Sequence, residues 1–368
     1  MIRVLVMGLT DTLGGVETYI YNLVKNTDRD KIHFDFLCQG REEAAYQRKI
    51  SEYYSRNVHF YFIPTFKKDI LNCIRLLKTI LSMKYDILYI NACIATDVLY
   101  AIPYARKYNT KVVVHSHGSS IDRKKLQHTL FKSVVSKYAD VRLACSINAA
   151  RFFWNDIDTV LLIKNGIEID RFRYSEDARE RVRRQYGVKD SQILLGHVGR
   201  LSYLKNQEYL LGIVKNLLDL GIDTKLLLVG DGEDRPALEN RIDRYCLREC
   251  VVLCGEQKNI SDYYSAFDVF VMPSISEGFP LVGVEAQTEG LLCVFSDTID
   301  NQIILTDKSV SLHLGNDNQR EWAVKIIDLI SSCENRDRTK YPIIMKQQGF
   351  DIKDTANHIQ ELFSRLVE

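Results

Sequence analysis

The sequence predicts an α/β protein with two domains, each built on a doubly wound parallel sheet, and three observations support this fold class. The chain has 368 residues, which exceeds one ordinary core at a typical size of about 150 residues per domain. Short β-branched and aromatic runs alternate with helical patterns, as they do in βαβ units. The alternation restarts after Asn165-Gly166, a dipeptide typical of turns. We therefore predict domains at residues 1–165 and 166–349.

Six strands are predicted in the first domain. Continuous apolar runs of this kind are typical of parallel strands that are buried on both faces. The expected strands span residues 4–7, 34–37, 58–62, 87–90, 111–115 and 141–144. The apolar run in the first ten residues is too short for a signal peptide, so we assign it to the first strand. Polar residues interrupt the apolar region 87–105, which therefore predicts a strand and a helix rather than a membrane span.

Five further strands are predicted in the second domain, and a helical or turn pattern follows each of them. They span residues 193–198, 225–229, 251–254, 269–272 and 293–296. This second series predicts a second parallel sheet with helices on its faces. A final helix is expected at about residues 355–367.

Composition and charge narrow the class of protein. Hydrophobic residues make up 46% and charged residues 26% of the chain, as in ordinary globular proteins. The net charge of +1 conceals an asymmetry, because residues 1–165 hold 24 Lys and Arg against 15 Asp and Glu. A basic first half fits an anionic membrane surface or a phosphorylated acceptor. No aromatic-basic binding motif accompanies the charge, so we expect no nucleic-acid partner.

One basic amphipathic run, DRKKLQHTLFKSVVSK at residues 122–137, could contact an anionic membrane surface. It fits either a helix lying on anionic lipid or an ordinary solvated helix, and the sequence leaves both open.

The nine cysteines contain no C-x2-C pair. Cys246, Cys250 and Cys254 are spaced by four residues, but no histidine or further cysteine pair nearby completes a zinc set. We predict free, mostly buried thiols and no metal site. Such thiols favour a reducing cytoplasm.

The most informative stretch is residues 268–287, DVFVMPSISEGFPLVGVEAQ, which predicts a buried strand, a tight turn and a helix. Glu277 and Glu285 place two carboxylates near the carboxyl end of the strand, where open α/β sheets bind ligands. Backbone N–H groups at a helix start are unpaired donors suited to an anion. The expected donors belong to Gly278, Phe279 and Leu281.

Two glycine-containing loops also follow predicted strands. Gly14-Gly15 opens a helix and permits a close approach of backbone to phosphate, although a purely structural turn is an alternative. It is not G-x-G-x-x-G, which argues against a nicotinamide enzyme. Gly230 and Gly232 form a second such loop, in which neighbouring acidic residues are explained by the start of a helix.

Cations and histidines follow two other predicted strands. Arg200 and Lys205 lie five residues apart on a loop that enters a helix, and such cations neutralise a diphosphate. His115 and His117 end a predicted strand. We favour His117 as the functional residue, with a structural histidine as the alternative, and two strand histidines without a third ligand do not predict zinc.

Taken together, SEGFP with its E-x7-E spacing, GGVE, HSHG, GRL-x4-N and GDGE resemble the retaining glycosyltransferases of family 4 in their order along the chain. The resemblance covers nearly the full length. It implies a GT-B fold, in which two Rossmann-like domains face each other across a cleft. It also implies that a C-terminal segment, residues 350–368, packs back on the first domain.

The resemblance assigns roles to the candidate residues. It implies no metal, and a nucleotide-sugar donor for which a UDP-sugar is favoured and a GDP-sugar is the alternative. Arg200 and Lys205 would stabilise the leaving diphosphate, and Glu285 would hold the ribose. Glu277 and His117 would bind the transferred sugar. The donor-binding set implied is Gly14, Gly15, Arg200, Lys205, Gly230, Gly232, Gly278, Phe279, Leu281 and Glu285.

The acceptor follows only from the resemblance to capsule and exopolysaccharide enzymes. A glycan or a polyprenyl-diphosphate-linked oligosaccharide at the inner face of the membrane is expected. Three alternatives remain. One is a sugar-nucleotide epimerase of the same fold, which needs no acceptor. The second is a phosphorylase, for which the sequence shows no persuasive pyridoxal-phosphate lysine motif, and the third is a sugar-nucleotide-binding subunit without turnover.

Overall fold

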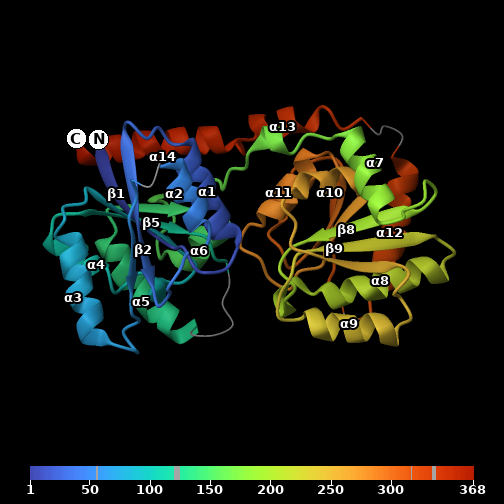
Figure 1. The fold of residues 1–368 in the computed structure, drawn as a ribbon, viewed down its shortest axis with the longest axis horizontal. Helices are drawn as coiled ribbons and strands as arrows, with labels where there is room; N and C mark the ends of the chain where they lie inside the picture. The colour runs from blue at the N-terminus through green and yellow to red at the C-terminus, as the bar shows by residue number, and fades with distance from the viewer. Residues whose placement is uncertain (55–56, 120–124, 316, 334–336) are drawn as a thin grey trace. The chain divides into compact units, whose positions relative to one another are not determined.

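The computed structural model describes residues 1–54, 57–119, 125–315, 317–333 and 337–368. The chain divides into two compact units, Met1–Ile167 with Gly349–Glu368 and Glu168–Gln348. Each unit is a parallel sheet with helices on both faces (Figure 1). The predicted α/β fold class is therefore confirmed.

The described part of the first unit holds a sheet in the order β3-β2-β1-β4-β5-β6-β7. The strands are β1 (Ile2–Met7), β2 (Ile32–Gln39), β3 (Phe60–Ile63), β4 (Ile87–Ala92), β5 (Lys111–Ser116), β6 (Val141–Ala144) and β7 (Val160–Leu162). All pairings are parallel. The strand order reverses between β1 and β4, and ligands bind at such a reversal in open α/β sheets.

Helices cover both faces of this sheet because alternate strand residues point to opposite sides. One face packs on α1 (Gly15–Asn26), α2 (Gln47–Tyr53) and α14 (Ile352–Val367). The other carries α3 (Ile70–Leu81), η1 (Ala95–Asp97), α4 (Ile102–Lys107), α5 (Lys125–Tyr138) and α6 (Ile147–Phe153). Helix α14 contacts α1, and both are visible on the first unit in Figure 1.

The start of α14 is held by a close backbone crossing. Asp351 caps the helix by accepting the N–H of Lys353 at 3.0 Å. A side chain at Gly166 would place its Cβ 2.6 Å from the Cα of Ile352. Only glycine permits this approach, which explains why Asn165-Gly166 stands where the chain leaves the first unit.

Helix α5 contains most of the basic amphipathic run, while residues 122–124 of that run lie outside the described residues. Its inward face is buried through His128, whose ring bonds to the backbone of Ala95 and Phe152, and through Val135. Among the described residues, no helix combines the length and apolarity needed to cross a bilayer.

The described part of the second unit holds a sheet in the order β10-β9-β8-β11-β12-β13, again parallel. The strands are β8 (Ile193–Val198), β9 (Thr224–Val229), β10 (Val251–Gly255), β11 (Val269–Met272), β12 (Leu292–Ser296) and β13 (Ser309–Leu312). The order reverses between β8 and β11, so this unit also has one switch point.

Helices of the second unit form two layers. One face packs on α8 (Gln207–Asp219), α9 (Arg235–Arg244) and α12 (Gln319–Ser332) through one apolar cluster. The other carries α7 (Glu176–Gln185), α10 (Ile260–Ala266), α11 (Leu281–Thr288) and α13 (Tyr341–Gln347). Asp268 fastens α7 to the start of β11 through ion pairs with Arg179 at 2.6 Å and Arg183 at 3.0 Å.

Two strands were missed from the sequence, and both lie at sheet edges. In β7, Leu161 and Leu162 are about half exposed. In β13 two of the four residues are serines. An edge strand has one neighbour rather than two, so its sequence carries a weaker apolar signal than that of a central strand.

Candidate active site

Two loops meet at the switch point of the second unit, after the neighbouring strands β8 and β11. The N–H of Ile275 donates to the carbonyl of Leu204 at 2.8 Å. The side-chain amide of Asn206 donates to the carbonyl of Pro273 at 3.1 Å. Asn206 has φ 54°, a left-handed conformation that asparagine tolerates better than most residues. The loops thus form one tied corner at the carboxyl ends of the strands.

This corner brings together Lys205 and Glu277, two of the predicted site residues. Lys205 ends the short turn η3 (Tyr203–Lys205), and its Nζ lies 2.5 Å from Oε1 of Glu277. Their side chains are 21% and 12% exposed, so the pair is largely shielded from solvent but still accessible. A charge-assisted bond at this distance positions both groups in advance of any ligand.

Arg200, the other predicted cation, lies in the same loop as Lys205 and has a separate partner. Its Nε donates to Glu233 at 2.8 Å, and both side chains are about half exposed. Of the acidic residues after Gly230, Asp234 is the N-cap residue of α9 and Glu233 directly precedes it. Glu233 has a further role, because its carboxylate orients Arg200.

The glycines after β9 allow two backbone segments to stack. Gly230 has φ 132°, and a Cβ there would lie 2.1 Å from the carbonyl oxygen of Gly199. A Cβ at Gly232 would lie 2.2 Å from the carbonyl oxygen of Leu201. The Leu201 N–H also donates to the Asp231 carbonyl at 3.0 Å. The glycine loop therefore supports the loop that carries Arg200 and Lys205.

This stacking predicts a strong effect for Gly230→Ala. The added methyl group must displace the Gly199 backbone and adopt a strained φ, so we expect a loss of about 1–3 kcal/mol in the free energy of unfolding. Donor affinity should fall with it. Chemical denaturation and calorimetry measure both quantities. The matched control is Gly221→Ala, where φ is 78° but a Cβ meets open space; equal losses in the two variants would contradict the stacking argument.

Glu285, the second carboxylate of the motif, lies inside α11 and is 8% exposed. The Tyr264 hydroxyl donates to its Oε2 at 2.9 Å. Burial raises the pKa of Glu285 to about 7, against the opposing effect of the Tyr264 hydrogen bond and the Arg171 charge.

The backbone donors expected at this helix start are only partly as predicted. Helix α11 begins at Leu281 with Pro280 as its N-cap residue. Gly278 and Phe279 precede the helix, in a bend. The sequence placed them at the helix start because SEGFP runs directly into the apolar helix pattern, but Pro280 is extended here (φ −75°, ψ 111°) and delays the helix.

In the first unit, Gly14 is the N-cap of α1 and Gly15 is its first residue, as predicted. Glu17 folds back over this turn, where it accepts the Thr10 hydroxyl at 2.6 Å. A Cβ on Gly14 would lie 2.5 Å from Glu17 Oε2, whereas one on Gly15 would meet open space. The two glycines therefore differ: Gly14 accommodates Glu17, and Gly15 leaves the helix N-terminus uncovered.

His117 follows β5 on the face that packs against α1, and it is 5% exposed. Its Nε2 lies 3.0 Å from Oδ1 of Asn91, which can only accept, so Nε2 carries the proton. Its Nδ1 is buried without a hydrogen-bond partner among the described residues. Burial lowers the pKa of His117 to about 3, which keeps the ring neutral.

His115 has a different environment. Its Nδ1 lies 2.8 Å from the Tyr89 hydroxyl, which also meets the Tyr19 hydroxyl at 3.0 Å. This chain of bonds is fully buried, so His115 fits a structural role.

The structure also identifies supporting residues that the sequence analysis did not select. Tyr264, Asn91 and Glu233 hold Glu285, His117 and Arg200 respectively. Each lies at least 21 positions away in sequence from the residue it holds. No local spacing signals such pairs.

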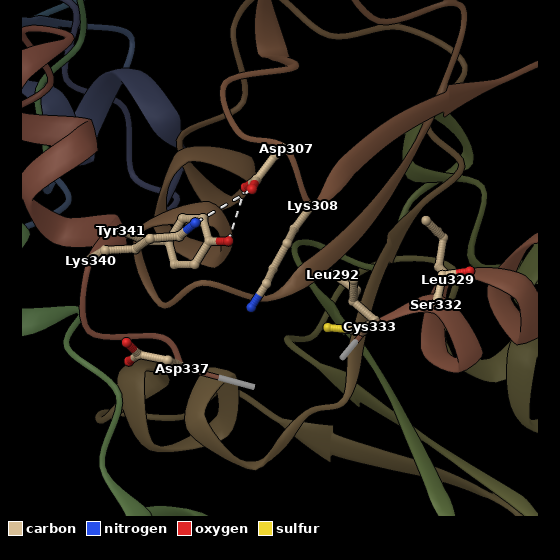
Figure 2. A pocket seen from close by; sticks show the side chains of 9 residues that line it. All are labelled: Leu292, Asp307, Lys308, Leu329, Ser332, Cys333, Asp337, Lys340 and Tyr341. Carbon is tan, nitrogen blue, oxygen red and sulfur yellow. Dashed lines mark hydrogen bonds and ion pairs between the residues drawn. The ribbon is translucent and has the colours of Figure 1, made fainter. Parts of the chain in front are cut away.

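Two other features lie apart from this corner. Among the described residues, no three His, Cys, Asp or Glu side chains gather as a metal site requires. A cavity of about 310 Å³ is lined by residues that include Lys308, Lys340 and Cys333 (Figure 2). Because Lys308 precedes β13, this cavity lies at the amino ends of the strands, opposite the predicted site.

Comparison with known families agrees with this geometry. A family described as glycosyltransferase family 4 matches residues 13–171, and one described as glycosyl transferases group 1 matches residues 178–343. The chain belongs to the family-4 type of glycosyltransferases. The two matches meet close to the division between the two units.

Relatives of this glycosyltransferase include glycosyltransferases of several bacteria. It is 29% identical over 301 residues to EpsF of Bacillus subtilis (strain 168), covering 79% of this chain and 78% of that protein. It is 26% identical over 326 residues to the UDP-Gal:alpha-D-GlcNAc-diphosphoundecaprenol alpha-1,3-galactosyltransferase of Escherichia coli, covering 83% and 82%. The structure of Anabaena Alr3699/HepE in complex with UDP-glucose matches with a TM-score of 0.81 at 20% identity, covering 99% of this chain and 100% of that chain. The fold of this glycosyltransferase is therefore GT-B.

Proposed function

We propose that this glycosyltransferase moves a hexose or related sugar from a UDP-sugar to a glycan or polyprenyl-diphosphate-linked acceptor, with retention at the anomeric carbon. The observation that carries the proposal is the Lys205–Glu277 pair at the β8–β11 switch point, with Arg200 in the same loop. The E. coli relative supports the acceptor class by its name, and the Anabaena structure supports the UDP-sugar by its ligand.

In this proposal, the donor diphosphate lies at the loop of Arg200 and Lys205. The two cations neutralise the charge that grows on the diphosphate as the sugar departs. Glu233 and Glu277 hold them in place beforehand, so little reorganisation is needed. Glu277 accepts hydroxyl groups of the transferred sugar, together with N–H donors of Gly278 and Phe279. Glu285 accepts the ribose hydroxyls.

His117 contributes a neutral acceptor from the first unit. Asn91 holds the Nε2 proton, and its own amide donates to the Met7 carbonyl at 3.3 Å, which sets its orientation. In this proposal His117 hydrogen-bonds a hydroxyl of the transferred sugar once donor binding exposes its Nδ1, which is buried in the ligand-free protein.

Retention follows if departure and attack take place on the same face of the sugar. The bond from the anomeric carbon to the diphosphate oxygen breaks, and the acceptor hydroxyl forms the new bond on that face. The acceptor proton passes to the departing diphosphate, so no side chain acts as a nucleophile.

The decisive experiment compares UDP-, GDP-, ADP- and dTDP-sugars by calorimetry and thermal shift. We expect binding of UDP-sugars that Arg200→Ala weakens and that Lys215→Ala, an exposed lysine on α8, leaves unchanged. Transfer is then measured with polyprenyl-diphosphate-linked oligosaccharides. Sugar interconversion without acceptor would favour an epimerase, and binding without transfer to any matched acceptor would favour a non-catalytic subunit. No nucleotide binding would overturn the proposal.

We also propose that α5 places this glycosyltransferase on an anionic membrane. Leu126, Leu130, Val134 and Tyr138 recur every fourth residue and are 74%, 62%, 40% and 41% exposed, so they form one outward apolar stripe. Lys137 lies beside the stripe in the last turn, and α5 contains no acidic residue. An apolar face with basic neighbours suits an interface rich in anionic lipid, where such an acceptor would be presented.

Replacing Leu126 and Leu130 together with serine should reduce binding to phosphatidylglycerol vesicles by about 10-fold or more, because two apolar side chains lose contact with acyl chains. Vesicle co-sedimentation measures this. Leu71→Ser is the matched control, since Leu71 is 79% exposed on a different helix. Equal binding by the double variant, or equal binding to phosphatidylcholine vesicles, would contradict the proposal.

A further inference from the structure

We infer that Tyr264 is a positioning residue for donor binding, whose hydroxyl holds the Glu285 carboxylate in the orientation that receives the ribose. Tyr264 would thereby set donor affinity without touching the donor. The inference rests on the role proposed for Glu285, and it extends the site to a residue on a different helix.

The geometry of Tyr264 suits this role. The side chain is fully buried near the end of α10. Its hydroxyl lies 2.9 Å from Glu285 Oε2 and 3.2 Å from the carbonyl oxygen of Val282, both in α11. Edge-on contacts with Phe172, Phe267 and Phe270 fix the ring, with centroid separations of 5.8–6.1 Å. The hydroxyl therefore has little freedom to follow a moving carboxylate.

The bond also leaves one side of the carboxylate for a ligand. Oε2 of Glu285 is occupied by Tyr264, while Oε1 accepts no hydrogen bond from the described residues. A carboxylate can accept several hydrogen bonds, so a diol can still bind to it. Without the tyrosine hydroxyl, the carboxylate could rotate, and the buried Oε2 would lose its donor.

The charged and polar groups around Glu285 also support a role for Tyr264 in donor binding. Glu285 faces Tyr264 from α10 and the Arg171 guanidinium from η2 (Ile169–Arg171), and Tyr264 in turn faces Glu289 and Cys293. The Tyr264 hydrogen bond and the Arg171 charge both favour the ionised form of Glu285, against burial. Removing the hydroxyl raises the pKa of Glu285 further, so that less carboxylate is available at pH 7 to accept ribose hydroxyls.

The same two helices carry a matched pair that supplies the control. One residue further along α10, the Ser265 hydroxyl donates at 3.0 Å to Oε2 of Glu289, the C-cap residue of α11. Glu289 is 0% exposed, so a nucleotide-sugar cannot reach its carboxylate. The Tyr264–Glu285 and Ser265–Glu289 bonds join the same helices, but only the first involves a carboxylate proposed to bind ligand.

The experiment compares Tyr264→Phe with Ser265→Ala by calorimetry with the UDP-sugar that binds the unmodified protein, from pH 6 to 9. We expect Tyr264→Phe to weaken the donor Kd by about 10-fold or more at pH 7, in line with the loss of a hydrogen bond to a charged group. The loss should shrink toward pH 9, where Glu285 ionises in both proteins. In transfer assays KM should rise more than kcat falls. Ser265→Ala should lower Tm without changing the Kd or its pH dependence.

Each other outcome has a definite meaning. An unchanged Kd in Tyr264→Phe, an effect that does not vary with pH, or an equal effect in Ser265→Ala would overturn the inference. Glu285→Gln separates the two hypotheses: if it binds donor normally, the role proposed for Glu285 fails, and if it loses binding while Tyr264→Phe does not, only the inference fails. Should Tyr264→Phe not fold, 3-fluorotyrosine at position 264 gives a second test, because its more acidic hydroxyl should tighten donor binding.

Discussion

Replacing Lys205 with alanine is expected to lower kcat/KM for the donor by about 100- to 1,000-fold, the usual effect of removing one preorganised group that stabilises transition-state charge. Lys205 Nζ lies 2.5 Å from Glu277 at the switch point, so its charge is already fixed where the proposed diphosphate departs. The larger part of the loss should appear in kcat, because charge on the diphosphate grows only as the sugar bond breaks.

The measurement is steady-state transfer with detection of released UDP, and Lys215→Ala on the exposed face of α8 is the control. A second variant tests whether Lys205 acts only by neutralising Glu277. In that case Lys205→Ala with Glu277→Gln would recover activity relative to Lys205→Ala alone. We expect no recovery, because Glu277 has its own proposed contact with the sugar.

Glu285→Gln is expected to weaken UDP-sugar binding by about 10- to 100-fold, because hydrogen bonds to a charged acceptor contribute roughly 1.5–3 kcal/mol. The same change should stabilise the ligand-free protein above neutral pH. Burial raises the pKa of Glu285 from 4.5 to about 7 in the folded protein. The folded state therefore holds a proton that the unfolded state has lost, and this lowers stability as the pH rises from 4.5 to 7.

Denaturation with and without donor at pH 5 and pH 8 checks both parts. We expect the variant to exceed the unmodified protein by about 1–3 kcal/mol in the free energy of unfolding at pH 8, and by much less at pH 5. Glu289→Gln is the control for binding, since Glu289 is buried at the C-cap of α11 and its pKa is also raised to about 7 by burial. If Glu289→Gln reduced donor affinity as much as Glu285→Gln, donor binding would not distinguish the two carboxylates.

The sequence predicted which residues belong to the central strands, because parallel strands buried on both faces require continuous apolar runs. Eleven strands were expected within a few residues of where they lie, and the two edge strands were missed. Motif spacing also selected Lys205 and Glu277 as candidates, and the structure brings them together. Each lies in the loop after a strand, and in a parallel sheet the segments after the strands share one edge.

Spacing alone could not predict which partner holds each of these groups. Glu233 precedes the start of a helix, and it also binds Arg200 from a different strand-end loop. The helix start at Leu281 rather than Gly278 depended on the backbone conformation of Pro280. The first point depends on a contact between distant segments and the second on one residue's backbone conformation. Motif spacing predicts neither of them.

The sequence by itself thus determined the fold class, the central strands and the loops that carry the candidate site. Only the tertiary structure decided the protonation and orientation of the candidate groups. Asn91 selects the His117 tautomer, and burial beside Tyr264 sets the pKa of Glu285. The physical reason is that hydrophobic periodicity is a local property of the chain, whereas desolvation and hydrogen-bond partners arise only when distant segments pack together.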